Sequence, residues 1–249
     1  MIDRKVSEDY SGGTILFGLG LATGVLTGLA IARMRSTPQR LPRLEVWQRA
    51  LAETKGQVKA ALLAAKVQTR YDELYVRRPR FAQRALRMHL ETSILPGLAL
   101  YQILRQEEGT EEEALAELDW LFAAWAQQAP KRKLLKLMER LPDPFAILRI
   151  GNRLAMRDFP PEGWTFEWLE DSSRCVAYNI YECFYLNVLT AYGAPELTAH
   201  FCRLDDLLFG DLQGISWERT KTLGRGDDCC DFRFCSMALP QGELEKHKR

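Results

Sequence analysis

An uncharged segment near the N-terminus constrains this chain more than any other feature. Residues 12–32 contain no Asp, Glu, Lys or Arg, and at about 1.5 Å per residue a helix of this length crosses the hydrocarbon core of a bilayer. The arginines that follow predict a single-pass membrane protein whose C-terminal domain is cytoplasmic. They also argue against a cleaved signal peptide, in which the positive charge precedes the apolar run. A buried helix of a soluble domain is the alternative, but six glycines would weaken such a helix in water.

Small residues recur along one face of the predicted membrane helix. Gly20, Gly24 and Gly28 are spaced by four residues, a spacing that lets two membrane helices approach closely. It predicts a homodimer through this face. Residues 1–11 then form an N-terminal tail, and residues 33–43, which contain two prolines, form a linker.

The next part of the chain has a helical pattern. Apolar residues recur at three- and four-residue steps from Leu44 to about Tyr75 and predict helical structure over this range. Thr110 before three glutamates is typical of a capped helix start. Residues 131–140 predict a basic helix, whose charges either face water or lie against anionic lipid headgroups.

The last third of the chain mixes strands with helices. A β-rich run at residues 173–181 predicts a strand, and helices are predicted at 184–192 and 195–209. Residues 215–223 and 229–237 predict an antiparallel β-hairpin around a Gly-Arg-Gly-Asp-Asp turn.

These elements predict one domain of the α+β class over residues 44–239. Its N-terminal two-thirds is mostly helical, and its C-terminal antiparallel hairpin or sheet packs with helices. A transmembrane helix precedes the domain and a charged tail at residues 240–249 follows it. The net charge is +1, so no basic field indicates nucleic acid as a partner.

The cysteines crowd toward the C-terminus. Five of the six lie between Cys183 and Cys235, and Cys229 is adjacent to Cys230. This crowding favours reduced thiols that serve chemistry or metal binding over spaced disulfides, and therefore a reducing compartment.

Several of these thiols lie close in sequence to carboxylates. Cys183 falls where a strand passes into a helix, a position that lowers a thiol pKa. Cys202 and Asp205 share one face of the predicted helix. On the closing strand, Cys230 points inward with the phenylalanines, whereas Asp231 lies on the other face. These five residues are the predicted catalytic set.

No metal-ligand set is assigned, because the sequence has neither paired Cys-x-x-Cys motifs nor a metalloprotease helix motif. Zn²⁺ held by cysteines with Asp205 stays open, since a metal would deprotonate thiols and activate water. His89 lies on an apolar helix, and we expect it to be a core residue.

Several motifs resemble those of a known family. They are Cys183…Gly193-Ala194-Pro195-Glu196-Leu197…Phe201-Cys202…Asp205, Arg219-Thr220…Leu223…Gly226…Cys230-Asp231-Phe232-Arg233-Phe234, His89-Leu90-Glu91…Ile94-Leu95-Pro96-Gly97 and Phe159-Pro160…Gly163-Trp164. The chain, over about residues 44–237, resembles the L-2-amino-thiazoline-4-carboxylic acid hydrolase family. The resemblance implies a cytoplasmic hydrolase that opens a thiazoline ring to give an N-carbamoyl cysteine. The predicted membrane helix departs from that soluble pattern.

The leading hypothesis is a membrane-anchored hydrolase that cleaves a C–N or C–S bond in a small sulfur- and nitrogen-containing heterocycle. A thiolate of Cys183 or Cys230 attacks the ring carbon, or Asp205 activates a water. Arg219 binds a substrate carboxylate, and Glu196 and Tyr178 complete the predicted substrate-binding residues.

The alternative belongs to a different class of protein. It is a non-catalytic, membrane-tethered module that binds a small ligand or a metal. Convergence of the thiols and Asp205 on a wet pocket favours the enzyme, whereas a dry, elongated apolar cavity favours the binding module.

Overall fold

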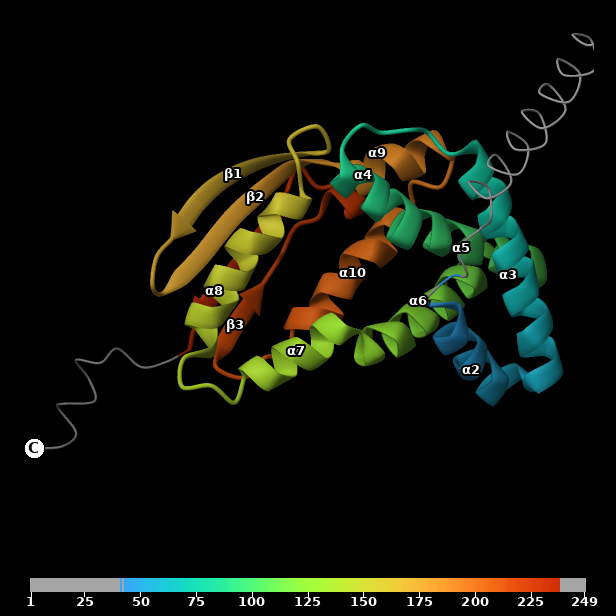
Figure 1. Ribbon diagram of the computed structural model, residues 1–249, viewed down its shortest axis with the longest axis horizontal. Helices are drawn as coiled ribbons and strands as arrows, with labels where there is room; N and C mark the ends of the chain where they lie inside the picture. The colour runs from blue at the N-terminus through green and yellow to red at the C-terminus, as the bar shows by residue number, and fades with distance from the viewer. Residues whose placement is uncertain (1–40, 42, 238–249) are drawn as a thin grey trace, which may run out of the picture. The chain divides into compact units, whose positions relative to one another are not determined.

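Helices fill the first part of the described chain and strands enter in the second (Figure 1). The computed structural model describes residues 41 and 43–237. The helical part comprises α2 (Leu44–Lys55), α3 (Gln57–Arg77), α4 (Arg84–His89), the π-helical turn η1 (Leu90–Ile94), α5 (Leu95–Glu107), α6 (Glu111–Gln128), α7 (Pro130–Met138), α8 (Pro144–Ala155) and the 3₁₀ turn η2 (Met156–Asp158). The mixed part comprises β1 (Trp164–Asp171), β2 (Cys175–Cys183), α9 (Phe184–Ala191), α10 (Leu197–Phe209), β3 (Ile215–Glu218), the 3₁₀ turn η3 (Leu223–Arg225) and β4 (Cys230–Ser236). The predicted mixture of helices with an antiparallel sheet is confirmed.

The predicted transmembrane helix at residues 12–32, with its glycine face, lies outside the described residues, as do both predicted tails. Among residues 41 and 43–237, no helix is long and apolar enough to cross a bilayer. The described part of the chain is the domain that follows the predicted linker.

The helical structure predicted from Leu44 to about Tyr75 is confirmed and consists of two helices. α2 ends at Lys55, and Gly56 adopts a φ of 79°, a conformation that glycine reaches without steric cost. α3 begins directly afterwards and packs against α2. The apolar spacing continues across Gly56, so the break between the two helices does not show in the sequence pattern.

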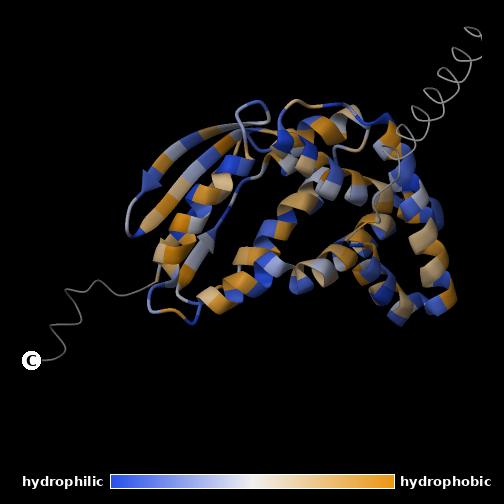
Figure 2. Ribbon diagram, viewed as in Figure 1, coloured by the Kyte–Doolittle hydropathy of each residue, from blue (hydrophilic) through white to orange (hydrophobic). Residues whose placement is uncertain are grey.

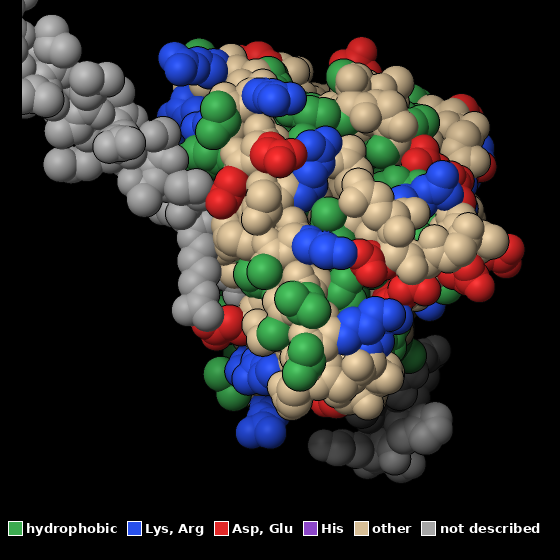
Figure 3. Space-filling model, turned by 90° about the vertical axis from the view of Figure 1, so that its right-hand side faces the viewer, with side chains coloured by type: hydrophobic (Ala, Val, Ile, Leu, Met, Phe, Trp, Pro, Cys, Tyr) green, Lys and Arg blue, Asp and Glu red, His purple; other side chains and the backbone are tan. Residues whose placement is uncertain are grey.

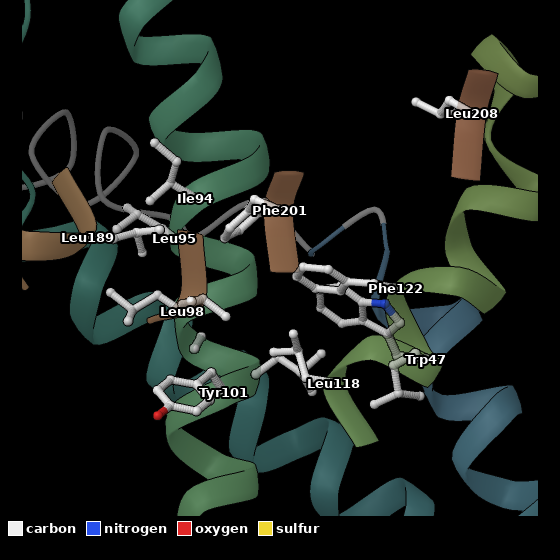
Figure 4. Packing of buried hydrophobic residues seen from close by; sticks show 14 of the residues in the cluster. Trp47, Ile94, Leu95, Leu98, Tyr101, Leu118, Phe122, Leu189, Phe201 and Leu208 are labelled. Carbon is white, nitrogen blue, oxygen red and sulfur yellow. The ribbon is translucent and has the colours of Figure 1, made fainter. Parts of the chain in front are cut away.

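The helices bury a continuous apolar core around α10 (Figure 4). Trp47 of α2 stacks on Phe122 of α6 with ring centroids 6.2 Å apart, and Phe122 lies 5.1 Å from Phe201 of α10. Gly97 of α5 allows this approach, because a Cβ there would lie 2.4 Å from the Cζ of Phe201. This packing holds α10, which carries two predicted site residues, against the helical part of the domain.

Local sequence signals explain two further helices. The Thr110 hydroxyl accepts from the backbone N–H of Glu113, whose carboxylate accepts from the N–H of Thr110, so α6 begins as predicted. α7 confirms the predicted basic helix. Its Arg132, however, is buried and donates to the carbonyl of Leu208 at 2.9 Å and to the carboxylate of Asp211. One charge of this helix therefore ties α7 to the end of α10.

The strands form one antiparallel sheet in the order β1-β2-β4-β3. The predicted hairpin is present, but β3 ends at Glu218 and residues 219–229 connect it to β4. β1 was not predicted. Polar and apolar residues alternate along β1 and β2 (Figure 2). The apolar side of β4 faces α10, where the ring of Phe209 lies 5.1 Å from that of Phe234.

A disulfide joins the two central strands. Cys175 of β2 is paired in register with Cys235 of β4, with their Cα atoms 4.1 Å apart, and the two sulfurs are bonded. The expectation of reduced thiols is therefore wrong for Cys235. It holds for the four cysteines that remain free, which are Cys183, Cys202, Cys229 and Cys230.

Charges of both signs are mixed on the face that α3 contributes (Figure 3). Arg70 pairs with Glu73 at 2.6 Å, and Arg78 pairs with Glu91 at 2.7 Å. Such exposed pairs contribute little stability each. They leave no broad patch of one charge on this face.

Candidate active site

Three free cysteines converge between the sheet and α10. Cys183 ends β2, Cys202 lies in the second turn of α10, and Cys230 begins β4 opposite Ile180. The thiol of Cys202 is hydrogen-bonded to the sulfur of Cys230, and Cys183 is close enough to act electrostatically on Cys202. Pairing of β2 with β4 and packing of α10 thus gather thiols that are separated by up to 47 positions in the sequence.

Asp205 lies one turn beyond Cys202 and forms an ion pair with Arg219. An Nη1–Oδ2 distance of 3.1 Å joins them, and the other terminal nitrogen of Arg219 lies 2.8 Å from Asp206 and 2.9 Å from the carbonyl oxygen of Cys202. The Arg219 side chain is only 3% exposed, and its guanidinium carbon lies 5.6 Å from the ring centroid of Trp217 and 5.3 Å from that of Phe232. Arg219 is therefore a fixed counterion of α10.

Burial raises the pKa of Asp205 above its usual range, although Arg219 opposes the shift. The same side chain keeps 34% of its surface accessible. Both observations hold for a carboxylate that is enclosed by protein yet lines a space that water can enter. A carboxyl group in such a place holds its proton to a higher pH than an exposed aspartate does.

The two bonded thiols differ in acidity. The hydrogen bond from Cys202 lowers the pKa of Cys230, and the backbone N–H of Leu223, 3.2 Å from its sulfur, lowers it further against the effect of burial. Donation to Cys230, together with burial and the nearby Asp205 charge, raises the pKa of Cys202. The arrangement makes Cys230 the more acidic thiol of the pair.

The pKa of the Cys183 thiol shifts in the direction opposite to the one predicted. It is the residue before the first turn of α9, and backbone N–H groups of Tyr185 and Leu186 face its sulfur, but burial dominates and raises its pKa to about 11. The prediction of a lowered pKa was wrong because the helix N-terminus does not offset the loss of solvation. Cys183 belongs to the cluster as a neutral thiol.

Tyr178 lies on the sheet face that the cluster shares. Its ring stacks on Phe232 with centroids 5.2 Å apart. Burial raises its pKa, and the Asp205 charge adds to the shift. Tyr178 is thus a neutral hydroxyl close to Asp205.

Two predicted site residues lie outside the cluster. Glu196 accepts a hydrogen bond from Tyr101 at 2.7 Å, in a separate polar pocket. Asp231 accepts from the backbone N–H groups of Thr220 and Lys221 at 2.9 and 2.6 Å, and thereby shapes the connection before β4. Neither carboxylate shares a contact with the three thiols.

A series of hydrogen bonds that the sequence did not reveal begins near the cluster, at the residues around Tyr185. The Nε2 of His89 lies 2.9 Å from the carbonyl oxygen of Asp158, so this nitrogen donates, and Nδ1 accepts from the Tyr185 hydroxyl at 3.0 Å. Tyr185 accepts from Ser93, and Ser93 accepts from Arg43 at 2.9 Å. The predicted core role of His89 fits this arrangement, since burial lowers its pKa and keeps it neutral. In the sequence, Arg43 contributed only to the predicted orientation of the membrane helix.

Two pockets border this region. One, of about 310 Å³, is lined by Cys202 and Arg219 together with Asp119, His200, Asp206 and Arg225. The other, of about 300 Å³, is mainly apolar and reaches Asn152 and Lys131. Cys202 and Arg219 therefore line the polar pocket, whereas none of the three thiols lines the apolar one.

The structure offers no support for bound zinc. Among residues 41 and 43–237, no three His, Cys, Asp or Glu side chains are arranged to hold a metal ion. The thiols of the cluster bond to each other and to backbone N–H groups, as described above. We assign no step to a metal.

The fold and the cluster define an α+β protein with a buried thiol–carboxylate site. Residues 87–234, more than half of the chain, match the L-2-amino-thiazoline-4-carboxylic acid hydrolase family, and the chain belongs to this family. The predicted family is thus confirmed, and the match supports a hydrolase function. The matched range includes all three thiols, Asp205 and Arg219.

No curated protein matches the chain significantly. Among solved structures, the Fe(II) unliganded H-NOX protein from K. algicida is 12% identical, with a TM-score of 0.38 over 81% of this chain and 98% of that one. A mutant of the same protein is 10% identical, with a TM-score of 0.32 over 79% of this chain and 95% of that one. At these TM-scores the likeness carries no argument about this chain.

Proposed function

We propose that this chain is a hydrolase that opens a small cyclic isothiourea of the 2-amino-thiazoline-4-carboxylate type. The observation that carries the proposal is the position of Cys202, which donates a hydrogen bond to Cys230 and lies one helical turn from Asp205 on α10, so that a thiol and a carboxyl group flank the same residue. Family membership supplies the substrate class.

The ring carbon between sulfur and nitrogen is the electrophile. The Cys230 thiolate attacks it, the ring C–S bond breaks, and the released thiolate takes a proton from Asp205 in its acid form. Asp205 then removes a proton from water, which attacks the same carbon and expels the Cys230 thiolate. One water is consumed, and the product is an N-carbamoyl cysteine.

A direct route uses the same residues without a covalent intermediate. Asp205 as carboxylate activates water for attack on the ring carbon, and the ring sulfur leaves with the proton that Asp205 gained. In this route Cys230 only binds the substrate. Trapping of a Cys230 adduct separates the two routes.

The test uses the full-length chain in detergent. Release of N-carbamoyl cysteine from 2-amino-thiazoline-4-carboxylate is followed by mass spectrometry. Cys230→Ala is expected to abolish turnover, whereas Cys229→Ala, at the adjacent buried thiol outside the cluster, is the matched control and should retain it. Equal activity in the two variants would exclude the thiol route. Absence of turnover in the wild-type chain, with this and related cyclic isothioureas, would exclude the hydrolase.

A specific observation favours a second function. The apolar pocket of about 300 Å³ is lined by aliphatic side chains of α7 and α8 with Phe209 and Phe234, which suits a hydrophobic ligand. A non-catalytic binding module would bind a fluorescent anilinonaphthalene sulfonate there. Gly151→Leu, which fills this pocket, would weaken that binding and leave ring opening unchanged if the hydrolase proposal is right.

The membrane anchor is also a proposal. The uncharged segment at residues 12–32 and the arginines after it support a single-pass protein with a cytoplasmic domain, and Gly20, Gly24 and Gly28 support a homodimer. Retention in the membrane pellet after alkaline extraction tests the anchor, and recovery in the supernatant contradicts it. Gly24→Leu should weaken dimerisation in detergent.

A further inference from the structure

Six strongly exposed apolar side chains gather on α7, α8 and the turn between them. We call them the α7–α8 face, and they are Leu134, Leu137, Leu141, Ile147, Ile150 and Leu154. Their exposed fractions range from 45% to 66%. Exposed apolar residues that are scattered singly are ordinary, whereas a contiguous group marks a contact surface.

The α7–α8 face is separate from the side of each helix that the core covers. Its residues recur at three- and four-residue steps along the chain, so they share one side of each helix. On another side, Leu135 and Met138 of α7 and Phe145 and Leu148 of α8 are buried. The domain therefore leaves a second apolar side of both helices uncovered.

The apolar pocket lined by α7 and α8 accounts for only part of this face. Ile150 and Leu154 do not line the pocket, although they are 59% and 52% exposed. A small ligand in the pocket would leave both side chains in water. An occupant that covers the whole face has to be an extended apolar surface.

Basic residues accompany the face along the chain. Residues 131–157 contain eight Lys or Arg and two acidic residues, in a chain whose net charge is +1. Asp171 and Asp211 of neighbouring segments pair with four of these eight bases. The other four are exposed and have no ion pair within the described part of the chain, and they are Lys131, Lys133, Arg140 and Arg157.

These unpaired cations decide which extended surface fits. In a two-fold dimer the face would meet its own copy, and four unpaired cations from each chain would be brought together at a cost in free energy. A bilayer with anionic lipid offers hydrocarbon to the apolar side chains and negative headgroups to the bases. Long Lys and Arg side chains reach such headgroups while their neighbours enter the hydrocarbon.

We propose that the α7–α8 face docks on the surface of a membrane that contains anionic lipid. The four unpaired bases contact the headgroups, and the six apolar side chains enter the boundary of the hydrocarbon. The inference goes beyond the proposed hydrolase and the proposed anchor, because an anchor holds a chain at a membrane without selecting the side of the domain that faces the lipid. It also assigns the basic helix at residues 131–140 to lipid headgroups.

The test reads the surroundings of one residue of the face in the full-length chain. Leu137→Cys is labelled with nitrobenzoxadiazole and reconstituted into vesicles of phosphatidylcholine, with or without phosphatidylserine. With phosphatidylserine, the emission should shift to the blue and be quenched by doxyl-labelled lipid. Val58→Cys, at a side chain of α3 that is 76% exposed, is the matched control and should emit as it does in detergent. The labelled wild-type chain gives the background from the native thiols.

Removal of single charges tests the role of the bases. Lys133→Gln and Arg140→Gln should each lower the ratio of docked to undocked chain about fivefold, which is the effect of one basic residue near an anionic membrane surface. Lys59→Gln removes an exposed lysine of α3 and should leave the ratio unchanged.

Other results would overturn the proposal. Equal emission from the labels at positions 137 and 58 in phosphatidylserine vesicles would show that the face stays in water. Equal burial with and without phosphatidylserine would remove anionic lipid as the partner. A label shielded already in detergent, with energy transfer between labelled chains, would assign the face to a second copy. Alkaline extraction tests the anchor separately: if it releases the chain, burial that still depends on phosphatidylserine would uphold docking without the anchor.

Discussion

Arg219 and Asp205 form an ion pair of 3.1 Å that joins the connection after β3 to the middle of α10. The guanidinium is almost fully buried, whereas the carboxylate is one-third accessible. The pair therefore fixes Asp205 in place and limits the rise of its pKa while leaving one side of the carboxylate open to the site.

Replacement of Arg219 should shift the pH dependence of the reaction. Arg219→Lys removes the second donor and weakens the force that lowers the pKa of Asp205, so this pKa rises further. In the covalent route Asp205 starts in its acid form, so the basic limb of the pH–rate profile is expected to move to higher pH. In the direct route Asp205 must be ionised to accept a proton, so the acidic limb is expected to move to higher pH instead. The free energy of unfolding should fall by about 2 kcal/mol. A profile in which neither limb moves would remove Asp205 from the proton transfer.

Removal of the Cys202 thiol should make Cys230 a weaker acid. The hydrogen bond from Cys202 is the largest influence that lowers the pKa of Cys230, so Cys202→Ala is expected to raise that pKa. Thiolate-dependent turnover would then need a higher pH, without being abolished. Alkylation of Cys230, followed by peptide mass spectrometry across pH, measures the shift directly. Unchanged alkylation rates would show that Leu223 and Arg219 suffice to keep the pKa of Cys230 low.

Gly97 should tolerate no side chain. A Cβ at this position would lie 2.4 Å from Phe201 and 3.0 Å from Phe122, so Gly97→Ala is expected to cost about 1–3 kcal/mol through overpacking. Gly151→Ala is the matched control, because no atom lies within 4 Å of its added Cβ in α8. Gly151→Ala should raise the free energy of unfolding by about 0.5–1 kcal/mol. Urea denaturation measures both, and similar values for the two variants would contradict the packing.

Loss of the disulfide should destabilise the sheet. Cys175 and Cys235 close a loop with a sequence separation of 60, for which chain entropy predicts about 4 kcal/mol. The Cys175→Ser, Cys235→Ser variant should unfold at lower urea, and reductant should shift only the wild-type chain. Detection of six free thiols in the unreduced protein would contradict the bond. Such a result would also agree with a cytoplasmic location, where disulfides are rare.

His89 should make stability depend on pH. Burial lowers its folded pKa below the unfolded value of about 6.5, so its contribution is complete above that pH. The contribution is lost as the pH falls toward the folded pKa, because the unfolded chain binds the proton more tightly. Urea unfolding from about pH 7.5 to about pH 5.5 should show a decline that is smaller in His89→Gln. An identical decline in both proteins would assign it to other groups.

Local signals in the sequence accounted for many elements. The capping pattern at Thr110, the β-rich run into Cys183 and the alternation of Cys230, Phe232 and Phe234 each depend on neighbours within a few positions. They were predicted because propensity and periodicity act over that range. β1 was missed, since seven of its eight residues are at least partly exposed and its pairing with β2 is broken by two register shifts.

The site was only partly predictable. Cys202 and Asp205 share a helix face in any α-helix, so their proximity followed from spacing. The direction of each pKa shift did not, because it depends on burial and on partners from other elements. Cys183 became a weaker acid despite its place at a helix start. Asp231 and Glu196 are close in sequence to the cluster, but their carboxylates accept hydrogen bonds from residues outside it.

The order of helices and strands, the thiol-rich last third and the family resemblance were all determined by the sequence itself. The tertiary structure alone decided that Arg219 is already paired, that Cys175 and Cys235 are bonded, and that Arg43 donates to Ser93. The physical reason is distance along the chain. Arg43 and Ser93 are brought together by packing of separate segments, and no local pattern encodes the surroundings that such packing creates.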